Sequence, residues 1–214
     1  MDEYVWYAGY GSNIDTLRFY HYIKGGTLRI TGRNHFGSQD KTLPIKQSTY
    51  FTNHELYFAK TSSPWEDKAV AFLKATPDNS KITVCVLYLV TKQQFVDIMV
   101  QENGKKPPMQ DIILDMEAAK RGEDSFIGKS NQYTWYGRLL YLGEHEGFPI
   151  YSFTSKDSDD AIVPAEPGAN YLQVIGNGLM ANNGMTAKEA SVYLLSKRGV
   201  TNSSWTLERI KHLF

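Results

Sequence analysis

The chain has 214 residues, 42% of them hydrophobic and 21% charged, which is the composition of a globular protein. Lys plus Arg and Asp plus Glu number 23 each, so the formal net charge is zero. A general nucleic-acid-binding protein needs a basic excess to neutralise phosphates, so we expect no nucleic-acid partner. No apolar run approaches the roughly 18 residues that span a bilayer, and the first residues are acidic. We therefore expect a soluble, cytoplasmic protein without a membrane partner.

The cysteines and histidines give no sign of a metal site. Cys85 is the only cysteine, which excludes an intramolecular disulfide and a cysteine-rich zinc site. The five histidines are scattered, and none has a second histidine at the spacing of a metal site. We therefore predict no bound metal.

The N-terminal segment predicts a strand followed by a helix. Residues 5–10 are aromatic and β-branched and stop at Gly11, as a strand does before a turn. A helix is expected over residues 14–23, with Asn13 as its N-cap and Asp15 in its first turn.

The middle of the chain predicts further strands. Residues 49–59 indicate a short strand pair or one broken strand, and residues 69–76 and 81–90 are the clearest strands. The turn sequence at residues 77–80, Pro-Asp-Asn-Ser, predicts that these two strands form an antiparallel pair.

Two capping boxes mark helix starts in the rest of the chain. Thr91 with Gln94, and Thr186 with Glu189, have the spacing at which the two side chains satisfy each other's backbone donors. The remaining predicted elements are, in order, two helices, two strands and a helical C-terminal part, over residues 91–103, 109–121, 133–142, 148–154 and from about 170, with a short terminal helix over 205–214.

This order of elements predicts the fold class. Strands and helices do not alternate strictly, so a doubly wound parallel sheet is not expected, and an α+β fold with a mainly antiparallel sheet or barrel fits better. No internal repeat or linker is visible. We therefore predict a single domain over residues 1–214.

The strand-to-helix turn Tyr10-Gly11-Ser12-Asn13 is a candidate binding loop. Gly11 allows close backbone approach. The polar side chains and the first amides of a helix offer donors to a carboxylate or phosphate. The same residue types also form ordinary N-caps, so these four residues alone leave both interpretations open.

Glu102 is a candidate general base. At about 100° per residue it projects close to Phe95, within the apolar stripe of the helix over 91–103, whereas Asp97 and Gln101 are expected to point away from that stripe. Desolvation among apolar groups prepares a carboxylate to accept a proton near neutral pH. The alternative is that the helix frays before Gly104 and Glu102 reaches solvent.

The N-terminal sequence Val-Trp-Tyr-Ala-Gly-Tyr-Gly-Ser-Asn, residues 5–13, resembles the start of the γ-glutamylcyclotransferase-like superfamily. A Glu on a helix after the middle strands also matches, in the place of Glu102, and Trp-Tyr-Gly-Arg at residues 135–138 resembles the closing strands. The resemblance covers residues 4–154. The chain departs from the family at Met99, where an Asp is common, and in its helical extension from about residue 165.

The resemblance implies a small, mainly antiparallel β-barrel with flanking helices and a pocket at its mouth. It implies intramolecular aminolysis, in which the α-amine of a γ-glutamyl compound attacks its own side-chain carbonyl and releases 5-oxoproline and an amine or amino acid. Glu102 would be the catalytic acid/base, and Tyr10, Gly11, Ser12 and Asn13 would bind the small-molecule substrate. The reaction needs no cofactor, because its nucleophile is already tethered.

Two other functions remain open at this point. One is a non-catalytic protein on the same fold that binds a small carboxylate or a peptide terminus. The other is an enzyme that processes γ-glutamyl amides with a different acceptor, such as a polyamine or an antibiotic intermediate.

Overall fold

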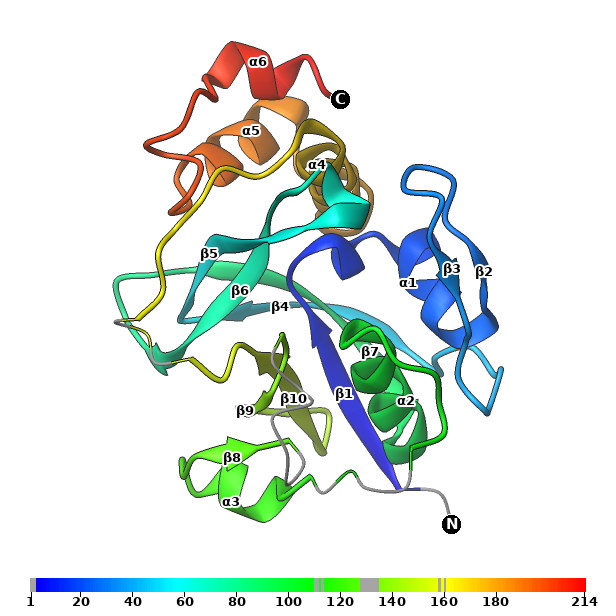
Figure 1. Ribbon diagram of the computed structural model, residues 1–214. Coiled ribbons are helices and arrows are strands. Elements are labelled where there is room, and N and C mark those ends of the chain that lie inside the picture. Colours follow the sequence, from blue (N-terminus) through cyan, green and yellow to red (C-terminus); the bar gives the residue numbers. More distant parts are fainter. Residues whose placement is uncertain (1–2, 110–111, 113, 128–134, 158, 160) are drawn as a thin grey trace.

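The computed structural model describes residues 3–109, 112, 114–127, 135–157, 159 and 161–214 (Figure 1). Its strands are β1 (Tyr4–Gly9), β2 (Gly26–Thr27), β3 (Asn34–His35), β4 (Gln47–Thr52), β5 (His54–Ser62), β6 (Lys68–Pro77), β7 (Thr83–Thr91), β8 (Ser125–Phe126), β9 (Arg138–His145) and β10 (Phe148–Thr154). Its helices are the 3-10 turns η1 (Ser12–Ile14) and η2 (Ser63–Trp65) and the α-helices α1 (Thr16–Lys24), α2 (Lys92–Glu102), α3 (Met116–Lys120), α4 (Ala169–Asn183), α5 (Ala187–Leu195) and α6 (Leu207–Lys211).

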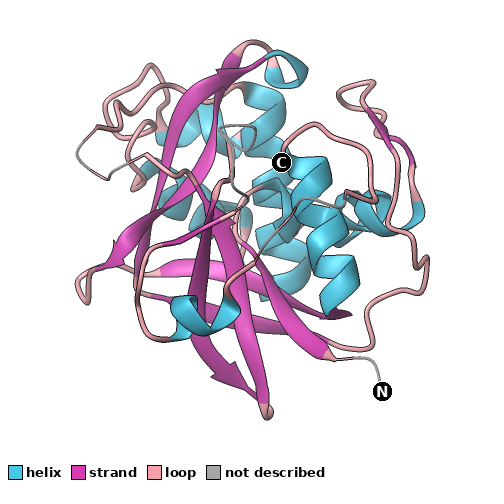
Figure 2. Ribbon diagram, turned by 60° about the horizontal axis from the view of Figure 1, so that its bottom comes forward, coloured by secondary structure: helices cyan, strands magenta, loops and turns pink. Residues whose placement is uncertain are grey.

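Six strands form one sheet in the order β4-β7-β1-β10-β9-β8. Strands β1 and β10 are parallel, with Trp6 opposite Ile150, and the other neighbouring pairs are antiparallel. Helix α2 packs on β1 and β7 and also against α1 (Figure 1). Figure 2 shows helices packed beside the long strands of the sheet. The predicted α+β class with a mainly antiparallel sheet is therefore confirmed.

Strands β5 and β6 form a separate two-stranded ribbon, and hydrogen bonding among the described strands does not close a barrel. Threonine side chains join the ribbon to the sheet instead. Thr83 Oγ1, on β7, accepts from Leu56 N at 3.1 Å and donates to His54 O at 2.7 Å. Thr154 Oγ1, on β10, accepts from Leu73 N at 3.1 Å and donates to Leu73 O at 2.5 Å. Single threonine hydroxyls, rather than ladders of backbone hydrogen bonds, thus join the ribbon to β7 and to β10. The described strands therefore form an open sheet with an attached ribbon in place of the expected barrel.

The predicted antiparallel pairing of residues 69–76 with 81–90 is wrong. Both segments are strands, but β6 pairs with β5, whereas β7 pairs with β1 and β4. Residues 49–59 contribute to two strands, β4 and β5, and β5 takes the edge of β6 through the short connection that contains η2. All but the last residue of β7 are buried, which suits a strand with neighbours on both edges.

Side-chain caps begin the α-helices of the described residues except α4, and one of the caps differs from the prediction. The capping boxes at the starts of α2 and α5 are both present, as predicted. Asn13 is not the N-cap of α1, because it lies within the 3-10 turn η1. Asp15 caps α1 instead, by accepting a hydrogen bond from Arg18 N at 2.8 Å. Asn13 therefore has its side chain free for other contacts.

Asp97 and Gln101, which the sequence predicts to point away from the apolar stripe, are nevertheless buried. Asp97 accepts a hydrogen bond from Gln39 N at 2.7 Å, and Gln101 accepts one from Gly37 N at 2.9 Å. Gln101 also donates to Tyr22 O at 2.9 Å. The segment between β3 and β4 thus packs on the polar face of α2 and pairs its backbone with these side chains.

Two other predicted elements are shorter in the structure. Of the predicted helix over residues 109–121, only α3 is helical, and residues 110, 111 and 113 lie outside the described residues. The strand predicted over 133–142 appears as β9, which begins at Arg138, and residues 133 and 134 lie outside the described residues.

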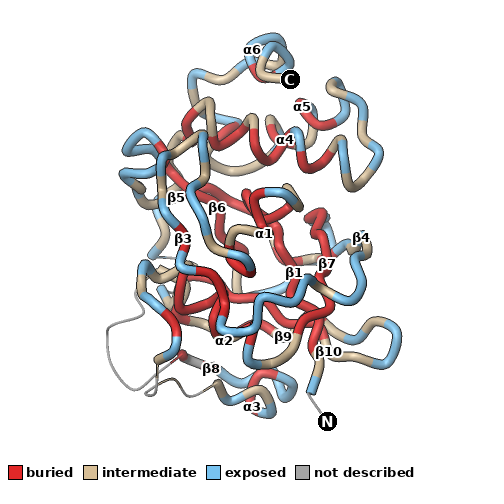
Figure 3. Tube along the Cα trace, turned by 90° about the vertical axis from the view of Figure 1, so that its right-hand side faces the viewer, coloured by how far each residue is buried: buried red, intermediate tan, exposed pale blue. Residues whose placement is uncertain are grey.

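The C-terminal helices share the buried core with the sheet (Figure 3). Helix α4 lies directly on η1: a Cβ added at Gly178 would come within 2.2 Å of Ile14 Cγ2 and 2.7 Å of Asp15 N. Asn182 donates a hydrogen bond to Ile14 O at 2.8 Å. Glycine at position 178 therefore allows the close approach that fixes the 12–15 turn from outside. None of the helices in the described part of the chain has the length and apolarity of a membrane span.

Candidate active site

A cavity of about 300 Å³ opens where β1 ends, and residues from distant parts of the chain line it. Its walls come from the turn after β1, the end of α2, the η2 turn, β6 and α4. All five of the site residues predicted from the sequence are among its lining residues: Tyr10, Gly11, Ser12, Asn13 and Glu102.

The Tyr10–Asn13 loop is fixed by contacts on several sides. Tyr10 Oη donates to Phe153 O at 2.8 Å, which ties the loop to β10. A Cβ added at Gly11 would lie 2.9 Å from Tyr171 Oη and 3.0 Å from Ala71 Cβ, so the loop backbone touches α4 and β6 there. The absence of a side chain at Gly11, rather than an unusual φ angle, is what this packing requires.

The side chain of Asn13 connects the loop to Glu102. Its Nδ2 donates to Glu102 Oε1 at 2.6 Å and to Tyr7 Oη at 2.7 Å. Its Oδ1 accepts from the guanidinium of Arg18. The backbone of Asn13 is held as well, because Tyr88 Oη donates to its carbonyl at 2.9 Å.

Glu102 is the last residue of α2 and is half-buried. Neither an ion pair of Glu102 nor a hydrogen bond to its Oε2 is found among the described residues. It is also the one carboxylate among the described residues that line the cavity. The two candidate features of the sequence therefore lie together, and their roles in substrate binding and catalysis stay predictions.

Arg18 is a lining residue that the sequence analysis did not single out. It is buried, and its Nη2 donates to Tyr22 Oη at 3.1 Å. Its Cζ lies 5.2 Å from the ring centroid of Tyr22 and 5.6 Å from that of Trp65. Burial alone would lower the pKa of Arg18, but Tyr22 and Glu102 outweigh burial and raise it, so the guanidinium stays charged. The i, i+4 spacing of Arg18 and Tyr22 is the only sequence signal that could have paired them.

Three tyrosines of the wall were also missed. Tyr171, from α4, accepts a hydrogen bond from Ala71 N at 3.1 Å, and Tyr136 donates to Ala71 O at 3.1 Å. Burial raises the pKa of Tyr7, Tyr136 and Tyr171 above the usual value, so each phenol remains protonated at neutral pH. Tyr171 comes from the helical extension, outside the residues that carry the family resemblance.

Arg33 supplies a second cation at the cavity. It is half-buried, and its Nη2 donates to Gln101 O at 2.9 Å, at the C-terminal end of α2. In the described part of the chain no group of three or more His, Cys, Asp or Glu side chains is placed to hold a metal ion.

Solved structures with this architecture identify the fold. A γ-glutamyl cyclotransferase superposes with a TM-score of 0.51 and 14% sequence identity, over 98% of this chain and 99% of that chain. The chain has the γ-glutamyl cyclotransferase-like fold. An uncharacterized protein from Homo sapiens also superposes with a TM-score of 0.51 and 14% identity, over 99% of both chains.

Sequence comparison adds one relative. No family model matches the chain. Histone deacetylase 5 of Arabidopsis thaliana is 31% identical over 199 residues, which make up 89% of this chain and 30% of that protein. The chain thus spans less than a third of the length of this curated relative.

Proposed function

We propose that the chain is a γ-glutamyl cyclotransferase-type enzyme, which releases 5-oxoproline and an amine or amino acid from a small γ-glutamyl compound. The observation that carries the proposal is the hydrogen bond between Asn13 and Glu102, which joins a donor-rich loop and a half-buried carboxylate across one cavity. The fold supports the same reaction. A cavity of about 300 Å³ lies at the lower end of the range for small-molecule sites.

The reaction moves two protons from the α-nitrogen to the leaving nitrogen and exchanges two bonds. Glu102 takes the first proton from the α-ammonium of the glutamyl group, and the free amine attacks the γ-carbonyl of the same molecule. A C–N bond closes the five-membered ring. The bond to the leaving nitrogen then breaks as Glu102 gives this proton to it, the ring nitrogen loses its second proton to Glu102, and the released amine takes up that proton. Because nucleophile and electrophile belong to one molecule, holding that molecule in a folded conformation supplies much of the rate.

The loop and its neighbours would hold the glutamyl end. Ser12 offers a hydroxyl, and its N–H and that of Asn13 begin a 3-10 turn and are not used within it. Arg33, the half-buried second cation of the cavity lining, adds a positive charge that favours the α-carboxylate.

The test is the release of 5-oxoproline from a panel of γ-glutamyl amines, γ-glutamyl amino acids and γ-glutamyl peptides, measured for the wild type and for Glu102→Gln. We expect release by the wild type and a loss of at least 100-fold in the variant. An acetyl-lysine peptide belongs in the panel because of the name of the curated relative. Acetate release without 5-oxoproline release would overturn the proposal, and binding of γ-glutamyl ligands without turnover would favour a binding protein on this fold.

A further inference from the structure

We propose that Arg18 is a positioning residue, which acts through the side-chain amide of Asn13 to determine which oxygen of Glu102 exchanges the proton. This inference rests on the proposed function. Its basis is a chain of side-chain contacts, in which Arg18 donates to Asn13 Oδ1 and Asn13 Nδ2 donates to Glu102 Oε1 at 2.6 Å.

The amide of Asn13 has two orientations, and Arg18 selects one of them. A guanidinium can only donate, so Arg18 requires the acceptor Oδ1 on its side. The amide group Nδ2 must then face Glu102 and Tyr7. Tyr7 does not select an orientation, because a phenolic hydroxyl can donate or accept.

The choice matters most when Glu102 carries a proton. An ionised Glu102 is an acceptor and itself favours the amide group of Asn13. A protonated Glu102 could donate to Asn13 Oδ1 instead, and the amide could then rotate. Arg18 removes this option, because rotation would place two donors against each other. Glu102 Oε1 therefore stays an acceptor throughout, and Oε2 both receives the proton and returns it.

Arg18 is fixed well enough for this role. Its side chain is 4% exposed and lies over the rings of Tyr22 and Trp65. Nη1 and Nη2 are used by Asn13 and Tyr22, and Nε is buried without a hydrogen-bond partner among the described residues. One N–H of each terminal nitrogen is thus committed to a neighbouring side chain. Arg18 should therefore affect turnover rather than affinity.

The experiment is a double-mutant cycle on the full chain with Arg18→Met and Asn13→Ala, measured as kcat and KM for 5-oxoproline release. A misplaced catalytic group typically costs about 10²-fold. We expect Arg18→Met to lower kcat by about this factor, with KM within about 3-fold of the wild-type value. In the Asn13→Ala background, Arg18→Met should lower kcat by less than about a further 3-fold, because the effects of coupled residues are not additive.

Arg18→Lys and Arg138→Met complete the set. Arg18→Lys keeps the charge and a donor, so it should fold and retain more turnover than Arg18→Met. Arg138 is a mostly buried arginine outside the cavity, and Arg138→Met should leave kcat per folded molecule unchanged. Three outcomes would each overturn the proposal. The first is a raised KM with unchanged kcat in Arg18→Met, and the second is additive effects on kcat in the cycle. The third is a loss of activity that only reflects a smaller fraction of folded protein.

A second measurement does not depend on activity. The side-chain amide protons of Asn13 should give two distinct, slowly exchanging NMR signals in the wild type, and these should broaden in Arg18→Met. If the wild type releases no 5-oxoproline but these signals behave as expected, the proposed function fails while the orienting role of Arg18 stands. Unchanged signals in Arg18→Met would contradict that role.

Discussion

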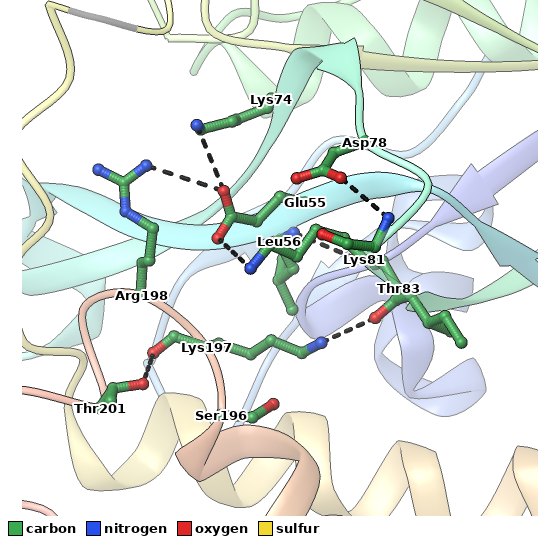
Figure 4. A network of polar contacts seen from close by, with 12 residues as sticks. Glu55, Leu56, Lys74, Asp78, Lys81, Thr83, Ser196, Lys197, Arg198 and Thr201 are labelled. Atoms are coloured by element: carbon green, nitrogen blue, oxygen red, sulfur yellow. Dashed lines mark hydrogen bonds and ion pairs between the residues drawn. The ribbon is translucent and has the colours of Figure 1, made fainter.

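Two half-buried glutamates are Glu102 at the cavity and Glu55 on β5, and their negative charges are balanced in different ways. The side chain of Glu55 is 12% exposed and has three cations within 4 Å, namely Lys74 at 3.4 Å, Arg198 at 3.8 Å and Lys81 at 3.9 Å (Figure 4). Glu102 has a hydrogen bond from a neutral amide, and its cation, Arg18, lies on the far side of that amide.

The difference is the one expected between a structural carboxylate and the proposed acid/base. The ion pairs of Glu55 tie the ribbon to the segment after α5. The side-chain amide of Asn13 lies between Arg18 and Glu102. It keeps the positive charge of Arg18 near the carboxylate and leaves Glu102 Oε2 without a hydrogen bond from the described residues.

The largest expected effect is that of Glu102→Gln. The amide keeps the size of the side chain but cannot accept the proton, and removing a positioned acid/base group costs roughly 10²- to 10⁴-fold in rate. We expect kcat to fall by at least 10²-fold while ligand binding and thermal stability stay near wild type. An active Glu102→Gln enzyme would contradict the mechanism.

Next is Gly11→Ala. Its Cβ would lie 2.9 Å from Tyr171 Oη, which is held by Ala71 N, and so the added methyl forces α4 or the loop to move. We expect binding of γ-glutamyl ligands to weaken by at least about 10-fold, with an overpacking cost of roughly 1–3 kcal/mol in the free energy of unfolding. Calorimetric titration and thermal melts measure both. Adding Tyr171→Phe should recover part of the stability, and no recovery would place the strain elsewhere.

The next prediction concerns the pH dependence of stability and the buried His35, which packs beside Tyr22. His35 packs edge-on against Tyr22, with ring centroids 4.5 Å apart, and burial followed by the charge of Arg18 lowers its pKa from 6.5 to about 3. Between these values only the unfolded chain binds the proton. The stability that neutral His35 contributes above pH 6.5 is therefore lost as the pH falls from 6.5 towards 3, by at most about 1.4 kcal/mol per pH unit.

His35→Phe removes this titration. Its free energy of unfolding should fall less steeply than that of the wild type between pH 6.5 and pH 4, measured by urea denaturation at a series of pH values. The exposed His212 offers a control, and His212→Phe should follow the wild-type curve. If the free energies of unfolding of His35→Phe and of the wild type change equally with pH, protonation of His35 is not linked to unfolding.

The smallest expected effect is that of Glu55→Gln, the counterpart of Glu102→Gln. Loss of this carboxylate leaves Lys74, Lys81 and Arg198 close together without their counter-charge. We expect the free energy of unfolding to fall by about 1–2 kcal/mol, with kcat within about 2-fold of wild type. A large loss of kcat in this variant would mean that the two glutamates are not separate in function.

Features that depend on short-range interactions could be predicted from the sequence alone. The first strand, the capping boxes at Thr91 and Thr186 and the turn after Tyr10 each depend on residues a few positions apart, and each is in the structure. The mainly antiparallel α+β class also followed from the order of the elements.

Tertiary structure decided what depends on contacts between distant segments. The neighbours of β6 and β7 depend on which strand edges meet, and a turn sequence between them does not specify that. Asp97 and Gln101 are buried because another segment supplies backbone partners, which helical periodicity cannot show. Asn13 and Glu102 are 89 residues apart in sequence. They touch because the turn after β1 and the end of α2 meet where β1 ends. The amide of Asn13 and the guanidinium of Arg18, both buried there, satisfy their hydrogen bonds with each other and with Tyr7, Tyr22 and Glu102.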